Sequence, residues 1–229
     1  MSGFLNTTVA RKFAMGLSGL FLVLYLALHV LINLISTISP DIYNALSEFM
    51  GYNFLIQAIM QPILVVGVVF HFVMAFVLEI NNKKARPIKY VKYKNKRTKY
   101  EEGNRNVTWM SQNMIYTGGV ILLFLALHMY DFFFPELSHK FATGYDPSVA
   151  HNFYEEVWVK FQDPIRLVLY IVAFVFLMLH MLHGFYGSFQ SVGWGDKRSA
   201  AVKGFAKWYS IIVPVLFIYI ALFHFFVKL

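Results

Sequence analysis

The stretch "FLMLHMLHGFYGSF", residues 176–189, places two histidines three residues apart within strongly apolar sequence. It belongs to an apolar segment of about residues 165–190. A helix of about 20 residues crosses a hydrocarbon core of roughly 30 Å, so this segment predicts a membrane-spanning helix. Ionisable side chains are costly inside such a helix and are functional candidates by default. The question is therefore which of His180 and His183 has a chemical role.

Four more apolar segments of similar length occupy the rest of the chain. The chain is 58% apolar and 14% charged, whereas charged residues approach a quarter of an ordinary soluble domain. It contains no cysteine, which excludes disulfides, thiolate metal sites and cysteine nucleophiles. We therefore expect an all-α membrane protein, with residues 1–229 forming one integral membrane domain. Its five transmembrane helices are predicted at about residues 13–35, 55–80, 107–131, 165–190 and 206–227.

Basic residues are concentrated on one side of the predicted spans. The N-terminal tail carries Arg11 and Lys12, residues 81–106 carry ten Lys or Arg, and residues 196–207 carry four. The positive-inside rule then places the N-terminus in the cytoplasm and the C-terminus outside. We expect a multi-pass protein of a bacterial inner membrane. The net charge of +8 largely reflects this rule, so no nucleic-acid partner is expected.

Each of the first four predicted helices carries at least one histidine, and these histidines fall at two depths. At a rise of about 1.5 Å per residue, His29 and His128 lie toward the outer side. His71 and His180 lie in the cytoplasmic half. We expect the first four helices to form an up-down-up-down bundle, in which the first and third helices, and the second and fourth, are diagonal partners. Each same-level pair therefore faces across the bundle.

Two facing imidazoles are suited to a haem b whose iron takes one histidine nitrogen on each face. With both axial positions filled, such a haem transfers electrons and does not activate oxygen. Zinc is less favoured because its sites need three or four clustered ligands. Small residues on the same helices would give two porphyrins room, although each also suits ordinary helix packing: Gly16, Ser18, Gly19, Gly67, Ala75, Gly118, Gly119, Gly184 and Gly187.

A weak internal repeat distinguishes the two histidines of the opening stretch. "LALHV" at Leu26–Val30 matches "LALHM" at Leu125–Met129, and "HFVMAF" from His71 matches "HMLHGF" from His180. Counting from His183 instead loses the phenylalanine match at the fifth following position. The repeat favours His180 as the ligand, with His183 as a haem neighbour or a helix-packing residue.

These features resemble the dihaem cytochrome b membrane anchor of complex II, in its single-chain five-helix form. This family comprises the succinate:quinone oxidoreductases and quinol:fumarate reductases. The resemblance is carried by "SGLFLVLYLALH" (Ser18–His29), "HFVMAFVLEINNKKARP" (His71–Pro87), "LALHMY" (Leu125–Tyr130) and "HMLHGFYGSFQSVGW" (His180–Trp194). It implies two haems b, the proximal one held by His71 and His180 and the distal one by His29 and His128.

The resemblance also implies partners and a substrate. A flavoprotein and an iron–sulfur subunit would dock on the cytoplasmic face and carry out the dicarboxylate chemistry, and the basic segment from Lys83 to Arg105 is a candidate dock or a lipid contact. A membrane quinone, menaquinone or ubiquinone, would exchange electrons with the haems. Glu48 is the first candidate for its protonation, ahead of His139 and His151. His224 is expected to be an interfacial residue.

Two other functions fit the same residues. One is the cytochrome b subunit of a hydrogenase or formate dehydrogenase, which would dock its partner on the outer side. The other is a proton or metal transporter that uses intramembrane histidines. The transporter predicts carboxylates within the helices, whereas Glu79 and Asp131 are expected only at helix ends.

Overall fold

The computed structural model describes residues 7–85, 113–144, 146, 151–194 and 199–227. Every element of regular structure within these ranges is a helix, which confirms the all-α prediction. The elements are α1 (Thr8–Ile35), α2 (Pro40–Tyr52), η2 (Ile56–Met60), α3 (Gln61–Ala85), α5 (Met114–His128), η4 (Met129–Phe133), α6 (Phe134–Ala142), α7 (Phe153–Phe161), α8 (Pro164–Ser191) and α9 (Ser199–Phe226). The η elements are π-helical turns that continue into the helices beside them.

Local sequence explains where several helices begin. The Thr7 side chain accepts a hydrogen bond from the Ala10 N–H and caps α1. Asp163 caps α8 by accepting the Ile165 N–H, and Pro164 follows at the first helical position. Such caps satisfy backbone donors that the first helical turn leaves free, and proline is tolerated there because it lacks one of those donors.

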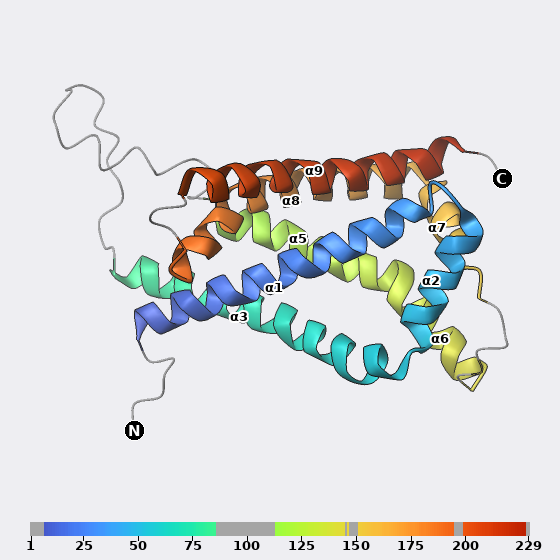
Figure 1. Cartoon of the computed structure of the whole chain (residues 1–229), viewed down its shortest axis with the longest axis horizontal. Coiled ribbons are helices and arrows are strands. Elements are labelled where there is room, and N and C mark those ends of the chain that lie inside the picture. The colour runs from blue at the N-terminus through green and yellow to red at the C-terminus, as the bar shows by residue number, and fades with distance from the viewer. Residues whose placement is uncertain (1–6, 86–112, 145, 147–150, 195–198, 228–229) are drawn as a thin grey trace.

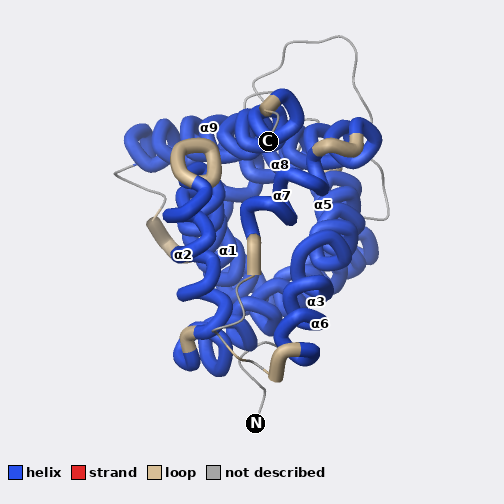
Figure 2. The backbone as a smooth tube through the Cα atoms, turned by 90° about the vertical axis from the view of Figure 1, so that its right-hand side faces the viewer, coloured by secondary structure: helices blue, strands red, loops and turns tan. Residues whose placement is uncertain are grey.

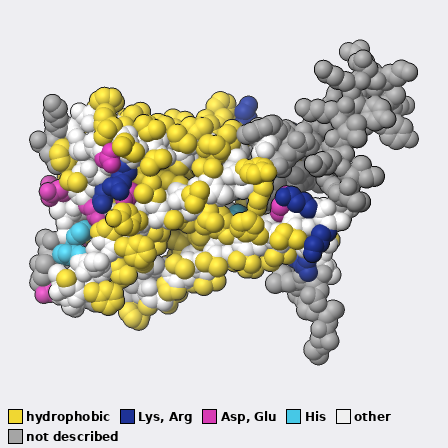
Figure 3. Space-filling view, turned by 180° about the vertical axis from the view of Figure 1, so that it is seen from behind, with side chains coloured by type: hydrophobic (Ala, Val, Ile, Leu, Met, Phe, Trp, Pro, Cys, Tyr) yellow, Lys and Arg dark blue, Asp and Glu magenta, His cyan; other side chains and the backbone are white. Residues whose placement is uncertain are grey.

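Five helical segments are long and apolar enough to cross a membrane: Thr8–Ile35, Ile56–Ala85, Met114–Ala142, Pro164–Ser191 and Ala200–Phe226. Their outward faces carry many exposed apolar side chains, among them Leu24 and Leu123, which are 65% and 74% exposed. In Figure 3, hydrophobic side chains cover most of the length of the molecule, and charged side chains gather toward the two ends. Apolar area of this extent suits lipid and not water, so the chain has the character of a multi-pass membrane protein.

The helix bounds differ most from the predicted ones in two places. The third helix continues beyond residue 131 through η4 and α6 to Ala142. Its charged residues are accommodated within the protein, as when Lys140 pairs with Glu136 at 2.6 Å, and so they do not end the helix. The last helix begins at Ser199 instead of residue 206. The predicted start of the third helix, at 107, lies outside the described residues.

The long helices lie side by side around a common axis. α1 contacts α3 and α8, and α5 contacts the same two helices. Within the described residues, no Cα atom of α1 comes within 8 Å of one of α5, and the same is true of α3 and α8. α9 packs along α8 and α1, while α2, α6 and α7 lie at the end of the molecule at which α9 ends (Figure 1). Seen end-on, α7 lies between α1 and α2 on one side and α3 and α6 on the other (Figure 2).

The closest approach between α1 and α8 occurs at Gly16. A Cβ atom at this position would lie 2.8 Å from Ser191 Cβ and 3.0 Å from the Ser188 carbonyl oxygen. We expect Gly16→Ala to lower the free energy of unfolding by about 1–3 kcal/mol, because the helices must separate. Gly119→Ala is the control, since a Cβ there would meet nothing within 4 Å.

At Gly119 the alanine is expected to be neutral or stabilising by up to about 1 kcal/mol, from helix propensity alone. Unfolding of both variants in detergent, followed by circular dichroism, measures the difference. Equal stabilities for the two variants would contradict the close packing of α1 on α8.

Candidate functional site

The four predicted ligand histidines lie as two facing pairs. His71 on α3 faces His180 on α8, with ring centroids 6.5 Å apart and an angle of 67° between the ring planes. His29 on α1 faces His128 on α5, with centroids 5.7 Å apart and an angle of 87°. One pair joins α3 to α8 and the other joins α1 to α5, so all four helices contribute to the candidate site.

The two pairs lie at different depths along the helices. A Cβ atom built on Gly19 would lie 3.6 Å from His71 Cε1, so His71 is level with Gly19 of α1. His29 follows Gly19 by ten residues, or about 15 Å of helix. The same relation holds on α5, where a Cβ on Gly118 would lie 3.5 Å from His180 Cε1 and His128 follows ten residues later. The structure therefore places two imidazole pairs about 15 Å apart along the bundle.

The spacing within each pair can be compared with the needs of a metal between two imidazoles. Metal–nitrogen bonds of about 2.0–2.1 Å on opposite sides put the ring centroids roughly 6–6.5 Å apart. The His71–His180 pair meets this spacing as it stands, and the His29–His128 pair is closer by less than one ångström. In the part of the chain that the structure describes, no three His, Asp or Glu side chains cluster to hold a metal ion. The donor set therefore fits an iron whose other ligands come from a porphyrin.

Hydroxyl groups contact one pair of rings. Ser18 Oγ lies 3.1 Å from His71 Nδ1, and Thr117 Oγ1 lies 3.1 Å from His180 Nδ1. The other pair differs, because His29 Nδ1 faces the Asn33 amide nitrogen at 3.5 Å. His128 Nδ1 is buried with no hydrogen-bond partner among the described residues.

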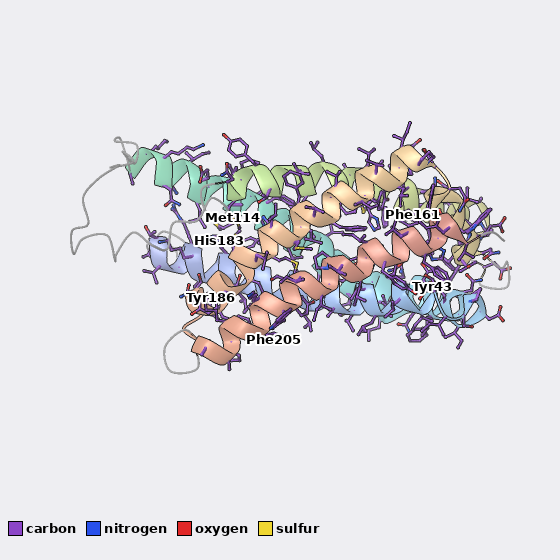
Figure 4. The ribbon with its side chains drawn as sticks, turned by 90° about the horizontal axis from the view of Figure 1, so that it is seen from above. Tyr43, Met114, Phe161, His183, Tyr186 and Phe205 are labelled. Carbon is purple, nitrogen blue, oxygen red and sulfur yellow. The ribbon has the colours of Figure 1, made fainter. Side chains whose placement is uncertain are left out.

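His183 lies one turn beyond His180 on α8 and is half-buried. Figure 4 shows it toward the end of the molecule at which Met114 begins α5 and Phe205 of α9 lies. Of these two histidines on α8, His180 is the one whose imidazole ring faces His71. His183 is therefore placed as a neighbour of the His71–His180 pair.

Glu48 is exposed on α2. Near the same end, burial raises the pKa of Tyr43 to about 12, so its hydroxyl stays protonated and donates to Asn33 Oδ1 at 3.4 Å. The rings of His139 and His151 are tilted by 46° with centroids 4.6 Å apart, and His151 Nε2 lies 3.2 Å from Glu156 Oε2. Polar groups thus gather at the end nearer the His29–His128 pair, and Glu48 is only one of them.

A buried ionic group beside His128 was not predicted. Asp131 is fully buried and lies inside a continuous helix, so the expectation that it sits at a helix end was wrong. Tyr170 donates its hydroxyl to Asp131 Oδ2 at 2.9 Å, and Arg166 Nη2 forms an ion pair with Oδ1 at 3.1 Å. Oδ1 accepts no hydrogen bond from the described residues, so the Arg166 contact is an ion pair without an aligned hydrogen bond. The sequence signal for this group was the position of Asp131, three residues after the candidate ligand His128.

His224, expected to be an interfacial residue, is fully buried within the protein near the end of α9. Its Nε2 lies 2.8 Å from Ser36 Oγ, and that hydroxyl donates to the Asn33 carbonyl. The side chains of Gln162 and Trp158 donate to the His224 and Val227 carbonyls and tie the end of α9 to its neighbours. His224 thus joins α9 to the end of α1.

Comparison with known proteins identifies no relative of this chain. No family model, no curated protein and no solved structure matches the chain.

Proposed function

We propose that this chain is the membrane-anchoring dihaem cytochrome b subunit of a succinate dehydrogenase or fumarate reductase. The observation that carries the proposal is the two facing histidine pairs, on four apolar helices and about 15 Å apart. Both pairs supply two nitrogen ligands across a bundle axis, which is the arrangement that a bis-histidine haem b requires.

In this proposal His71 and His180 hold the haem nearer the cytoplasmic partner, and His29 and His128 hold the distal one. The first four membrane helices form an up-down-up-down bundle, with the N-terminus in the cytoplasm. Bound haem would supply one-electron transfer across the apolar region. The protein's own part is to fill both axial positions, orient the rings and exclude water.

The partners are an iron–sulfur subunit and a flavoprotein on the cytoplasmic face of a bacterial inner membrane. Their dicarboxylate chemistry takes place outside this chain, which is an electron-transfer subunit. Basic side chains of the described residues at that end support such a dock: Lys12, Lys83, Lys84, Lys203 and Lys207. The basic segment between residues 86 and 105 lies outside the described residues.

Menaquinone or ubiquinone is the proposed electron acceptor or donor in the membrane. Glu48 is proposed to exchange protons with it, because its exposed carboxylate lies on α2, at the end of the bundle nearer the His29–His128 pair. General acid–base groups must lie within hydrogen-bond reach of the quinone oxygen. The nearby His139 and His151 are the other proton-exchanging groups of this end.

Two alternatives remain as competing proposals. A hydrogenase- or formate-dehydrogenase-type cytochrome b uses the same histidine pairs with a partner at the opposite end. A histidine-based transporter gains one feature from the structure, the buried carboxylate of Asp131. Arg166 and Tyr170 already engage both oxygens of this carboxylate, which favours a structural role over ion transfer.

Purification of the complex from native membranes under mild detergent tests the choice of partner. We expect a flavoprotein and an iron–sulfur subunit to co-purify with this chain. We also expect added succinate to reduce the haem iron, which the absorbance spectrum records. Co-purification of a hydrogenase or formate dehydrogenase, with reduction by hydrogen or formate but not succinate, would contradict the proposal. A purified chain that contains haem but lacks both reductions would contradict it as well.

A further inference from the structure

We infer that Ser18 and Thr117 are positioning residues for the His71–His180 pair, each fixing one imidazole in the tautomer that leaves Nε2 free to bind iron. This inference rests on the proposed function. It concerns residues of α1 and α5, the two helices that do not themselves supply this pair.

The hydrogen bonds of the two hydroxyls determine the tautomer. Ser18 Oγ donates to the Met15 carbonyl at 2.9 Å, and Thr117 Oγ1 donates to the Met114 carbonyl at 3.0 Å. A hydroxyl has one hydrogen to give, so each oxygen can only accept from the ring nitrogen 3.1 Å away. Both rings therefore carry their hydrogen on Nδ1, and Nε2 keeps its lone pair.

Burial protects these two hydrogen bonds from competition by water. Ser18 and Thr117 are 8% and 1% exposed, so water does not compete for the ring nitrogens as it would at a surface. Each hydroxyl is followed by a glycine, and a Cβ atom at that glycine would be in ordinary van der Waals contact with the ring, 3.6 Å at Gly19 and 3.5 Å at Gly118. Each imidazole therefore packs directly against the neighbouring helix, beside the residue that carries the hydroxyl.

The two positions are equivalent in the internal repeat. Ser18 precedes His29 by eleven residues in "SGLFLVLYLALH", and Thr117 precedes His128 by eleven in "TGGVILLFLALH". Each of these helices thus carries a ligand of the His29–His128 pair and, about 16 Å away, the hydroxyl that positions a ligand of the other pair. The repeat pairs a ligand with a positioning group on one helix face.

The two pairs consequently differ in electronic character. An acceptor on Nδ1–H makes an imidazole a stronger electron donor to its metal, which stabilises ferric iron. The His71–His180 pair has two such acceptors, whereas neither His29 nor His128 contacts a side-chain hydroxyl through Nδ1 in the described structure. A haem bound by the His71–His180 pair would therefore have a lower reduction potential than these ligands would give without their hydroxyl partners.

The test compares Ser18→Ala and Thr117→Val with the unaltered chain. We expect an upward shift of the reduction potential of one haem, with the other unchanged, and retention of the affected haem about 10–100-fold weaker. Thr117→Ser keeps the hydroxyl and is expected to restore both values. Ser210→Ala is the matched control, because Ser210 is fully buried and donates to the Ala206 carbonyl at 2.7 Å.

The outcomes separate this inference from the proposed function. If the unaltered chain holds two haems, and both variants keep its potentials and its haem retention, the inference is overturned while the proposed function stands. If the unaltered chain holds no haem, the proposed function fails. Nitrogen-15 NMR of labelled histidines in the haem-free chain then decides. The Nδ1–H tautomer at His71 and His180, lost in the respective variants, supports the inference, and an Nε2–H tautomer overturns it.

Discussion

Replacement of His180 by alanine is expected to lower the haem content of the purified chain from two haems b to one. The ring of His180 is the one that faces His71, at a centroid distance of 6.5 Å that suits a metal between them. Without it, His71 alone would hold the iron of that pair. Pyridine haemochrome analysis per polypeptide, with the optical spectrum of the reduced protein, measures the loss.

The neighbouring histidine provides the control. His183→Ala removes a half-buried imidazole of the same type from the same helix, one turn away, and is expected to keep both haems. Retention of two haems in His180→Ala together with loss of one in His183→Ala would reverse the assignment. Loss of both haems in His180→Ala, with the helical content intact, would contradict two independent sites.

Truncation of Arg166 to alanine is expected to destabilise the protein strongly, by about 3–5 kcal/mol and toward the lower end of that range. Asp131 is fully buried, and Arg166 is the cation paired with it at 3.1 Å. Its removal leaves a carboxylate in an apolar region with the Tyr170 hydroxyl as its remaining partner. The partial exposure of Arg166, at 25% of its side chain, is the reason for the lower figure.

Unfolding in mixed detergent, monitored by circular dichroism, measures this loss. The double variant Asp131→Leu with Arg166→Leu is the matched control, because removing both charges leaves no unpaired group and is often close to neutral. A single variant as stable as the unaltered chain would show that Asp131 is not charged in the folded protein. A double variant less stable than the single one would contradict the ion pair as the source of the effect.

The apolar segments were enough to predict the five membrane helices, because a hydrocarbon core imposes a length that sequence reveals directly. The helix ends were less predictable. Asp131, Glu136 and Lys140 interrupt the apolar run of the third helix, but each finds a partner inside the protein, and the helix continues to Ala142. Glu136 and Lys140 pair with each other within the helix, whereas the partners of Asp131 are distant in sequence.

The histidines could be found from sequence because ionisable residues in a span are rare, and their depths follow from helix geometry. Their partners could not be found in the same way. Ser18 was noted only as a small residue, since a hydroxyl on an apolar helix has no signature until its neighbour is known. The role of His224 depends in the same way on Ser36, which lies 188 residues away in the chain.

The haem content of the purified protein tests the central claim most directly. The account predicts two haems b per chain, with the sharp spectrum of low-spin six-coordinate iron in both. Two haems that bind carbon monoxide readily in the reduced state would contradict the filled axial positions. A chain purified from haem-sufficient cells with no haem would contradict the account as a whole.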